Sequence, residues 1–304
     1  MRRIRSVLRF ALPPLAACII LSAPQALFAA QQWIKVSSPN FELYTTAGQG
    51  KGRDAILHFE QVRNFFLKVG IKDPDVGGRV RIIGFQSAKE YEPYRANKIA
   101  FAYYLGGFGR DYIVMQQIDH DTYPVAIHEY VHLLIRHSGI ELPVWLDEGL
   151  AELYSTLEPY AKKVKVGEMS PGRLEIMNTS KLLDLDTLMK VDHSSPYYNE
   201  SNQANIFYAQ SWALTHMLML SDAYRPKYPD FVRALTSGLS PAEVFQKIYG
   251  KPLGQVQKEL EGYTRANSYK VAFFDTQLEK ASENPNVQPA PPAETGLVLV
   301  DLLF

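Results

Sequence analysis

The feature that most constrains the fold of this chain is an apolar run with three polar residues in it, AIHEYVHLLI at positions 126–135. On a helix, His128 and His132 are four positions apart, so they project from one face about one turn from each other. The other positions are apolar around most of the helix, which predicts that it is buried. A buried Glu129 without a partner is costly, and a metal ion removes that cost because two neutral imidazoles can coordinate Zn²⁺ directly. The H-E-x-x-H spacing therefore predicts two metal ligands with a carboxylate beside them.

A second segment, LPVWLDEGLAELY at positions 142–154, adds further carboxylates. Pro143 can begin a helix there. On this helix Glu148 and Glu152 are four positions apart and share a face, and we expect Asp147 to point elsewhere. The segment thus predicts a second helix with an acidic face that can meet the first one.

The connection between these two helices is short enough to force them into a hairpin. His132 and Glu148 lie roughly 6 to 8 Å from the connection, at about 1.5 Å per residue, so they can meet at one level. Gly149 lacks a Cβ and would let the second helix approach the first closely. Two histidines and a glutamate with an open fourth position are typical of a catalytic zinc site, and histidines satisfied by core hydrogen bonds are the structural alternative.

The motif pair resembles a known family. HEYVH at 128–132, followed by WLDEGLAE at 145–152, is similar to the gluzincin metallopeptidases, and most closely to their peptidase MA-like bacterial members. The resemblance is specific over residues 124–155 and diffuse over roughly 35–275. It implies a zinc ion that activates water for peptide hydrolysis. The resemblance implies His128, His132 and Glu148 as the zinc ligands. It implies Glu129 as the general base.

Two further residues gain roles from the resemblance. Glu152 matches a carboxylate that orients one ligand imidazole, as metal-bound histidines usually require. YAQSWALTHML at 208–218 resembles the helix in which gluzincin aminopeptidases carry a tyrosine that donates to the oxyanion, which gives that role to Tyr208. The lysine and glycine of the family pattern are Gln210 and Ser211 here, and an aromatic that only packs in a helix is the alternative for Tyr208.

The order of the sequence patterns predicts an α+β protein. Strand-forming segments and a helical period alternate before residue 122, and the pattern after residue 123 is mainly helical. We expect strands at 33–46 and 79–85, a helix at 51–69 and a hairpin at 101–116. The resemblance implies a zincin-like fold in which the active-site helix lies between an α/β half and a helical half.

These patterns divide the chain into four parts. Residues 31–122 form the α/β part and residues 123–278 the helical catalytic part. Residues 279–304 contain NPNVQPAPPAETG at 284–296, a Pro-rich linker expected to favour polyproline II over packed structure. The apolar tail that follows leaves an added strand, a docking peptide and a disordered end as open alternatives.

The fourth part, residues 1–30, has the pattern of a secretory signal peptide. A basic start leads into an apolar stretch at 10–21, which is too short and too interrupted by proline to span a bilayer comfortably. We therefore expect cleavage near Ala29 or Ala30 and an exported protein, periplasmic or secreted. The alternatives are an uncleaved interfacial anchor and a lipoprotein signal acylated at Cys18. Either of these would attach the protein to a membrane.

Composition argues against cysteine catalysis and against nucleic-acid binding. Cys18 is the only cysteine, so the folded part has no thiol nucleophile and no disulfide. Removal of residues 1–30 takes away four arginines and leaves 28 of the 32 basic residues against 32 acidic ones. A mildly acidic chain of this kind does not indicate a nucleic-acid surface. The composition leaves the oligomeric state open.

The expected substrate is a peptide or protein. The chain lacks the Gly-x-Met-Glu-Asn stretch with which related aminopeptidases hold a free N-terminus, which favours an endopeptidase, with a gluzincin-type aminopeptidase as the alternative. RDYIVMQ at 110–116 is the expected edge strand that pairs with the substrate, and an ordinary hairpin is its alternative. A silent zinc-binding module on the same scaffold is a third interpretation, although such a module has no need of Glu129. A helical protein with a chance H-E-x-x-H is the last.

Overall fold

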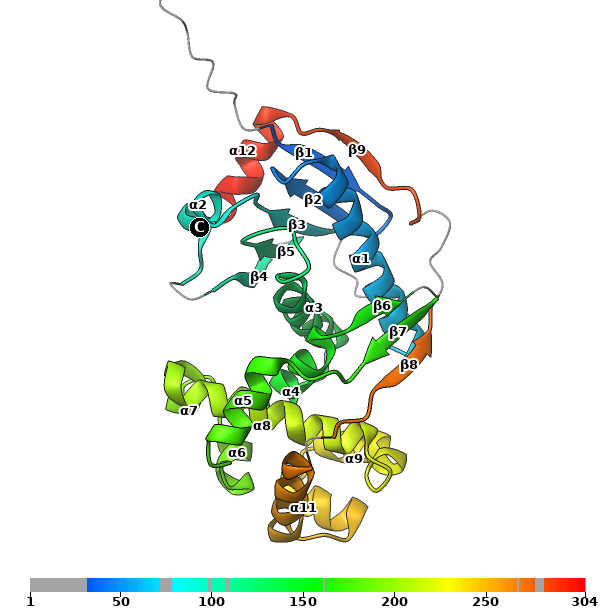
Figure 1. Ribbon diagram of the computed structural model, residues 1–304, viewed down its shortest axis with the longest axis vertical. Helices are drawn as coiled ribbons and strands as arrows, with labels where there is room; N and C mark the ends of the chain where they lie inside the picture. The colour runs from blue at the N-terminus through cyan, green and yellow to red at the C-terminus, as the bar shows by residue number, and fades with distance from the viewer. Residues whose placement is uncertain are drawn as a thin grey trace, which may run out of the picture. The chain divides into compact units, whose positions relative to one another are not determined.

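The strand-forming segments of the sequence pair into a mixed six-stranded sheet of order β4-β5-β3-β2-β1-β9 (Figure 1). The computed structural model describes residues 32–71, 78–97, 100–107, 110–160, 162–266, 268–276 and 282–303. The six strands are β1 (Ile34–Ser37), β2 (Phe41–Thr45), β3 (Val80–Gly84), β4 (Ala102–Gly107), β5 (Arg110–Met115) and β9 (Asn286–Pro289). The pairs β2–β3 and β3–β5 are parallel, and the pairs β1–β2, β1–β9 and β4–β5 are antiparallel. The α+β class expected from the sequence is confirmed at this level, and the expected 101–116 hairpin is β4–β5.

One face of this sheet carries the main core. Helix α1 (Gln49–Lys68) provides the crossover that the parallel pair β2–β3 needs, and it buries Ile56, Phe59, Val62 and Phe66 at helical spacing. The inward side chains of the strands, such as Leu43 and Ile113, join the same cluster. The expected 51–69 helix is therefore confirmed.

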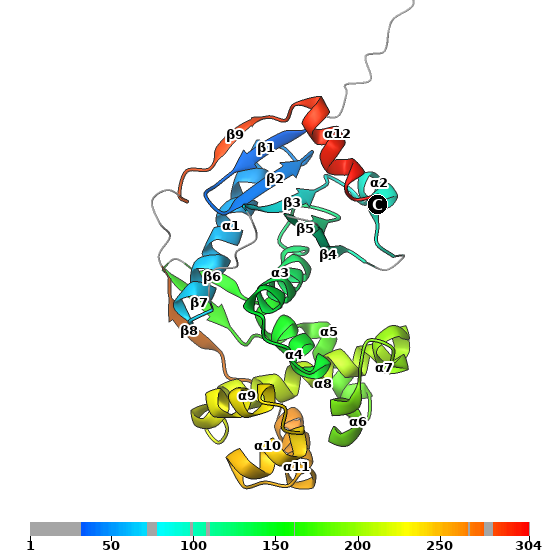
Figure 2. The ribbon, with the colours of Figure 1, turned by 180° about the vertical axis from the view of Figure 1, so that it is seen from behind.

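A C-terminal arm covers the other face of the sheet. Strand β9 pairs with β1, and α12 (Pro292–Val300) follows it along the chain (Figure 2). Val298 of α12 lies in a second cluster of buried side chains with Tyr44 and Tyr112. Glu294 accepts hydrogen bonds from Lys35, at 2.7 Å, and from the Tyr44 hydroxyl. The segment expected to be a Pro-rich linker thus forms a paired strand and a docked helix, because Pro289 sits at the end of a strand and Pro292 in the first turn of a helix, where proline is tolerated.

The helical part begins at α3 (Tyr123–Ser138), which is joined by a short connection to α4 (Val144–Ser155). Helix α8 (Ser201–Leu220) packs against α4 and also contacts α5, α7 and α11. The remaining helices are α2 (Ala88–Tyr91), α5 (Pro171–Thr179), α6 (Leu185–Lys190), α7 (Pro196–Asn199), α9 (Tyr228–Thr236), α10 (Pro241–Val244) and α11 (Leu253–Arg265). Within the described ranges, no helix combines the length and apolar character needed to cross a bilayer.

A small antiparallel sheet interrupts this helical part, which the sequence patterns did not indicate. Its order is β6 (Glu158–Tyr160), β7 (Lys163–Val166) and β8 (Ala272–Asp275). Val164 and Val166 are buried, and Phe274 contacts Phe65 of α1. These strands are only three or four residues long, which is too short for a period of two to be read from the sequence.

The docking of α12 leads to a test with a matched pair of substitutions. Val298 is 2% exposed and Val300 is 46% exposed on the same helix. We expect Val298→Ala to lower the free energy of unfolding by about 2 kcal/mol, because it removes buried methyl groups and leaves a cavity. Val300→Ala should change it by less than about 0.5 kcal/mol. Urea unfolding measures both, and equal effects of the two substitutions would contradict a docked α12.

Candidate metal centre

Helix α3 presents the two histidines expected from the sequence. Pro124 lies in its first turn, where the missing N–H costs nothing, and Gly139 ends it in the left-handed conformation at a φ of 68°. The Nε2 atoms of His128 and His132 are 3.1 Å apart on the same face of the helix. The spacing of four positions thus brings both imidazoles to one point.

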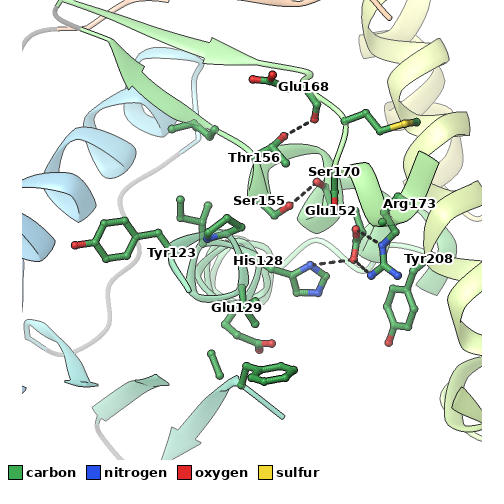
Figure 3. Close-up of a pocket in the computed structure, with 18 of the residues that line it drawn as sticks. Tyr123, His128, Glu129, Glu152, Ser155, Thr156, Glu168, Ser170, Arg173 and Tyr208 are labelled. Carbon is green, nitrogen blue, oxygen red and sulfur yellow. Dashed lines mark hydrogen bonds and ion pairs between the residues drawn. The ribbon is translucent and has the colours of Figure 1, made fainter. Parts of the chain in front are cut away.

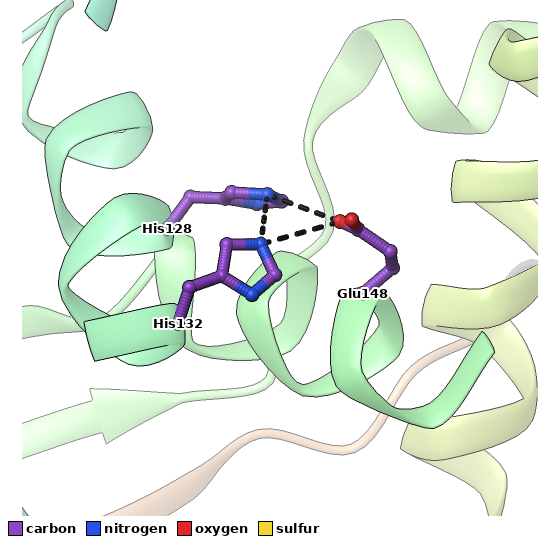
Figure 4. Close-up of side chains that lie close together, drawn as sticks. All are labelled: His128, His132 and Glu148. Atoms are coloured by element: carbon purple, nitrogen blue, oxygen red, sulfur yellow. Dashed lines mark hydrogen bonds and ion pairs between the residues drawn. The ribbon is translucent and has the colours of Figure 1, made fainter. Parts of the chain in front are cut away.

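Helix α4 brings a carboxylate to the same point, as the short hairpin predicts. The Oε2 atom of Glu148 lies 3.2 Å from His128 Nε2 and 3.4 Å from His132 Nε2 (Figure 4). Glu148 is only 3% exposed, and its Oε2 atom has no hydrogen-bond partner among the described residues. A buried oxygen in this position is costly unless a cation or a proton satisfies it. His128, His132 and Glu148 could therefore hold a metal ion, and we call these three residues the metal group.

Each imidazole faces a carboxylate from α4 on its other nitrogen. Asp147 Oδ1 lies 3.1 Å from His132 Nδ1, and Glu152 Oε1 lies 3.7 Å from His128 Nδ1. The hydrogen bond to Asp147 holds the proton of His132 at Nδ1 and leaves its Nε2 free to act as a ligand, whereas the contact of Glu152 with His128 is too long for a hydrogen bond. Glu152 lies near His128, and its role as the orienting carboxylate stays a prediction. The expectation that Asp147 points elsewhere is wrong.

The electrostatics of the group follow from this shared arrangement. Burial alone would lower the pKa of His132, but its hydrogen bond to Asp147 and the nearby charge of Glu148 outweigh burial and raise that pKa well above its usual value. Burial would raise the pKa of Glu148, yet the two imidazoles lower it below its usual range. The carboxylate is thus held ionised in a buried place, which is what a cation ligand requires.

Glu129 projects from α3 toward the sheet. Its Oε2 atom accepts a hydrogen bond of 3.1 Å from the backbone N–H of Tyr104 in β4, and burial raises the pKa of Glu129. Strand β4 lies at the end of the sheet, whereas β5 lies between β4 and β3. The expectation that residues 110–116 form the edge strand is therefore wrong: the edge strand beside the metal group is Ala102–Gly107.

A pocket of about 830 Å³ adjoins the group (Figure 3). His128, Glu129, Glu152 and Tyr208 line it together with Phe101 and Ala102 at the start of β4. Within it, Arg173 of α5 binds both oxygens of Glu152, at 2.8 and 2.6 Å, and its guanidinium lies over the Tyr208 ring. The pocket thus joins the metal group to the free edge of the sheet.

Tyr208 lies beside His128 in the wall of the pocket, and its role as an oxyanion donor stays a prediction. Its ring centroid is 6.5 Å from that of His128, and it projects from α8 into the pocket. Gln210, which replaces the lysine of the family pattern, is buried and bonds both backbone groups of Leu183 at 2.7 Å. Gln210 therefore holds a loop in place, whereas Tyr208 faces the open space.

Sequence reasoning missed three residues of this site. Asp147, Arg173 and Tyr198 each contact a residue of the metal group or its carboxylates. Arg173 and Tyr198 come from α5 and α7, well after the motif pair, and have no spacing relation to it that a sequence could reveal. Asp147 could have been found by asking which acids adjoin the expected ligand Glu148.

No protein-family model matches the chain, and no curated protein matches it.

The close packing of α4 on α8 gives a test of how Glu148 is positioned. A Cβ added at Gly149 would lie 2.1 Å from Thr215 Oγ1 and 2.6 Å from the Ser211 carbonyl oxygen. The missing Cβ thus serves the contact with α8 and not the contact with α3 that the sequence suggested. We expect Gly149→Ala to force the helices apart, to cost about 1–3 kcal/mol of unfolding free energy and to weaken metal binding.

The matched control is Gly262→Ala in α11, where an added Cβ meets no atom within 4 Å. It should stabilise the protein by roughly 0.5–1 kcal/mol, because alanine favours a helix more than glycine does. Thermal unfolding and metal titration of both variants provide the measurement. A Gly149→Ala protein that matches the control in both would show that this contact does not position Glu148.

Proposed function

We propose that the protein is an exported zinc metallopeptidase of the gluzincin type with a zincin-like fold, similar to the peptidase MA-like bacterial members. The observation that carries this proposal is the convergence of His128, His132 and Glu148 on one point, with Glu129 beside them. A mixed sheet with an antiparallel edge strand, set beside the helix that bears the histidines, supports the fold assignment.

Zinc fits the spacing of the three donor atoms. Bonds of about 2.05 Å to a tetrahedral zinc ion separate two ligand atoms by about 3.3 Å. The observed separations among the two Nε2 atoms and Glu148 Oε2 are 3.1, 3.2 and 3.4 Å. Two imidazoles and one carboxylate are also the donor set of catalytic zinc sites that keep a fourth position open. The spacing and the donor types therefore both favour zinc.

The bound zinc would supply a coordinated water of lowered pKa and polarise a carbonyl group. Glu129 can hold and move a proton, because its carboxylate is next to the ligands and, among the described residues, accepts one backbone hydrogen bond. It would take a proton from the attacking water and return it to the leaving amine. Tyr208, in the pocket wall, would donate to the oxygen on which charge develops.

The outer edge of β4 supports a peptide as substrate. The Tyr104 N–H points away from β5 and donates to Glu129, and backbone groups of the alternate residues Ala102 and Gly106 face the same side. An extended peptide can add to such an edge as a further strand and lie across the metal group. The pocket at the start of β4 has room for side chains of that peptide. A substrate bound along a strand supports an endopeptidase.

The alternatives are a gluzincin-type aminopeptidase and a zinc-binding module without turnover. Digestion of internally cleavable peptides with blocked N-termini, compared with amino-acid amides, separates endopeptidase from aminopeptidase. Zinc analysis of the purified protein, followed by peptide digestion with and without a chelator, separates an enzyme from a silent module. The retained Glu129 favours an enzyme, because zinc binding alone does not use it.

The proposed role of Glu129 gives a direct test. We expect Glu129→Gln to keep zinc, because Glu129 is not a ligand, and to lose peptide hydrolysis by at least a factor of about 100, as removal of a general base does. Zinc content and turnover of a peptide library are measured on the same sample. Glu141→Gln, at an exposed position in the connection after α3, is the control and should keep both. Wild-type turnover by Glu129→Gln would remove Glu129 from the mechanism.

A further inference from the structure

Tyr198 contacts the carboxylate of the metal group from outside the motif pair. Its hydroxyl donates a hydrogen bond of 3.0 Å to Glu148 Oε1. The other oxygen of Glu148, Oε2, faces the two histidine Nε2 atoms. The two oxygens of one buried carboxylate thus have separate tasks: one accepts from a phenol and the other is directed at the metal position.

The segment that carries Tyr198 is held by bonds of its own. Asn199 donates from Nδ2 to the carbonyl oxygens of His193, at 2.7 Å, and Ser195, at 3.2 Å. Ser195 accepts from the Tyr197 N–H at the start of α7. The turn before it is closed by Ser194, which bonds Asp192. The position of the phenol is therefore fixed by residues 192–199 and does not depend on its bond to Glu148 alone.

Packing of the ring adds to this local framework. The imidazole of His193 meets the ring of Tyr198 edge-on at 4.9 Å, and the rings of Phe207 and Tyr208 lie 6.3 and 6.1 Å away. Aromatic rings in such arrangements restrict one another's rotation. The hydroxyl is thus presented to Glu148 by a short helix packed on α8.

A carboxylate without this contact has two ways to meet a cation, through one oxygen or through both. Binding through both would fill the position that a catalytic zinc site keeps open. We propose that Tyr198 is a positioning residue of the metal centre: its phenol holds Oε1 of Glu148, so that Glu148 binds zinc through Oε2 alone. This inference rests on the metal centre of the proposed function but not on peptidase activity.

The neighbouring Tyr208 has a different place. Tyr208 lines the pocket beside His128 and Arg173. Tyr198 is not among the described residues that line this pocket. Tyr208 can therefore reach a bound substrate, whereas Tyr198 acts through Glu148. The two adjacent tyrosines separate the positioning of a ligand from contact with the substrate.

The test compares Tyr198→Phe with Tyr197→Phe in the full chain. Tyr197 is the preceding residue of the same short helix, and among the described hydrogen bonds Glu148 accepts only from Tyr198. Zinc affinity is measured by competition with a chromophoric chelator, and coordination by the visible spectrum of Co²⁺ bound in place of zinc. We expect Tyr198→Phe to bind zinc about 10–100-fold more weakly than Tyr197→Phe, as loss of an outer partner of a ligand does. Its Co²⁺ spectrum should change toward the weaker absorption of higher coordination.

Two results would overturn the proposal. The first is a zinc affinity of Tyr198→Phe equal to that of Tyr197→Phe. The second is a weaker affinity with an unchanged Co²⁺ spectrum, since that would indicate general loosening and not a change at Glu148. A wild-type protein that binds no zinc would contradict the metal centre as well, whereas one that binds zinc without cleaving peptides would contradict the proposed activity alone.

Discussion

The structure of this site depends on one constraint, the burial of the Glu148 carboxylate between two imidazoles. A charged oxygen that is removed from water must be compensated where it lies, because the interior cannot solvate it. The helix pair α3–α4 brings the imidazoles to it, and the missing side chain at Gly149 lets α8 close the other side. Each nearby element is placed so that this one group is satisfied.

The sequence was sufficient for the parts of the site that depend on local geometry. A spacing of four positions fixes His128 and His132 on one face, and a short connection brings Glu148 to their level. Helix α1, which the helical spacing of apolar residues indicates, and the β4–β5 hairpin also depend on local sequence, and both were predicted correctly. These features need no knowledge of how distant segments pack.

The remaining parts depend on packing that a sequence does not contain. Strand β3 pairs with β5 and not with β4, so β4 becomes the edge strand of the sheet. The direction of Asp147 depends on how α4 is rotated against α3, and two neighbouring acids on one helix cannot both be assigned from spacing alone. The C-terminal arm was misjudged because its prolines suggest an extended linker, whereas here they stand at the ends of ordered elements.

The two imidazoles differ in the carboxylates that they face, and Arg173 binds one of these carboxylates. Arg173 binds both oxygens of Glu152, so the charge of that carboxylate is compensated and its contact with His128 is long, at 3.7 Å. Asp147 has His132 as its ion-pair partner at 3.1 Å, and the pKa of His132 is accordingly raised well above its usual value. The guanidinium that compensates Glu152 also packs over the Tyr208 ring. One cation therefore links the carboxylate that faces His128 to the position of the tyrosine in the pocket wall, so a change at Arg173 should disturb both sides of the pocket together.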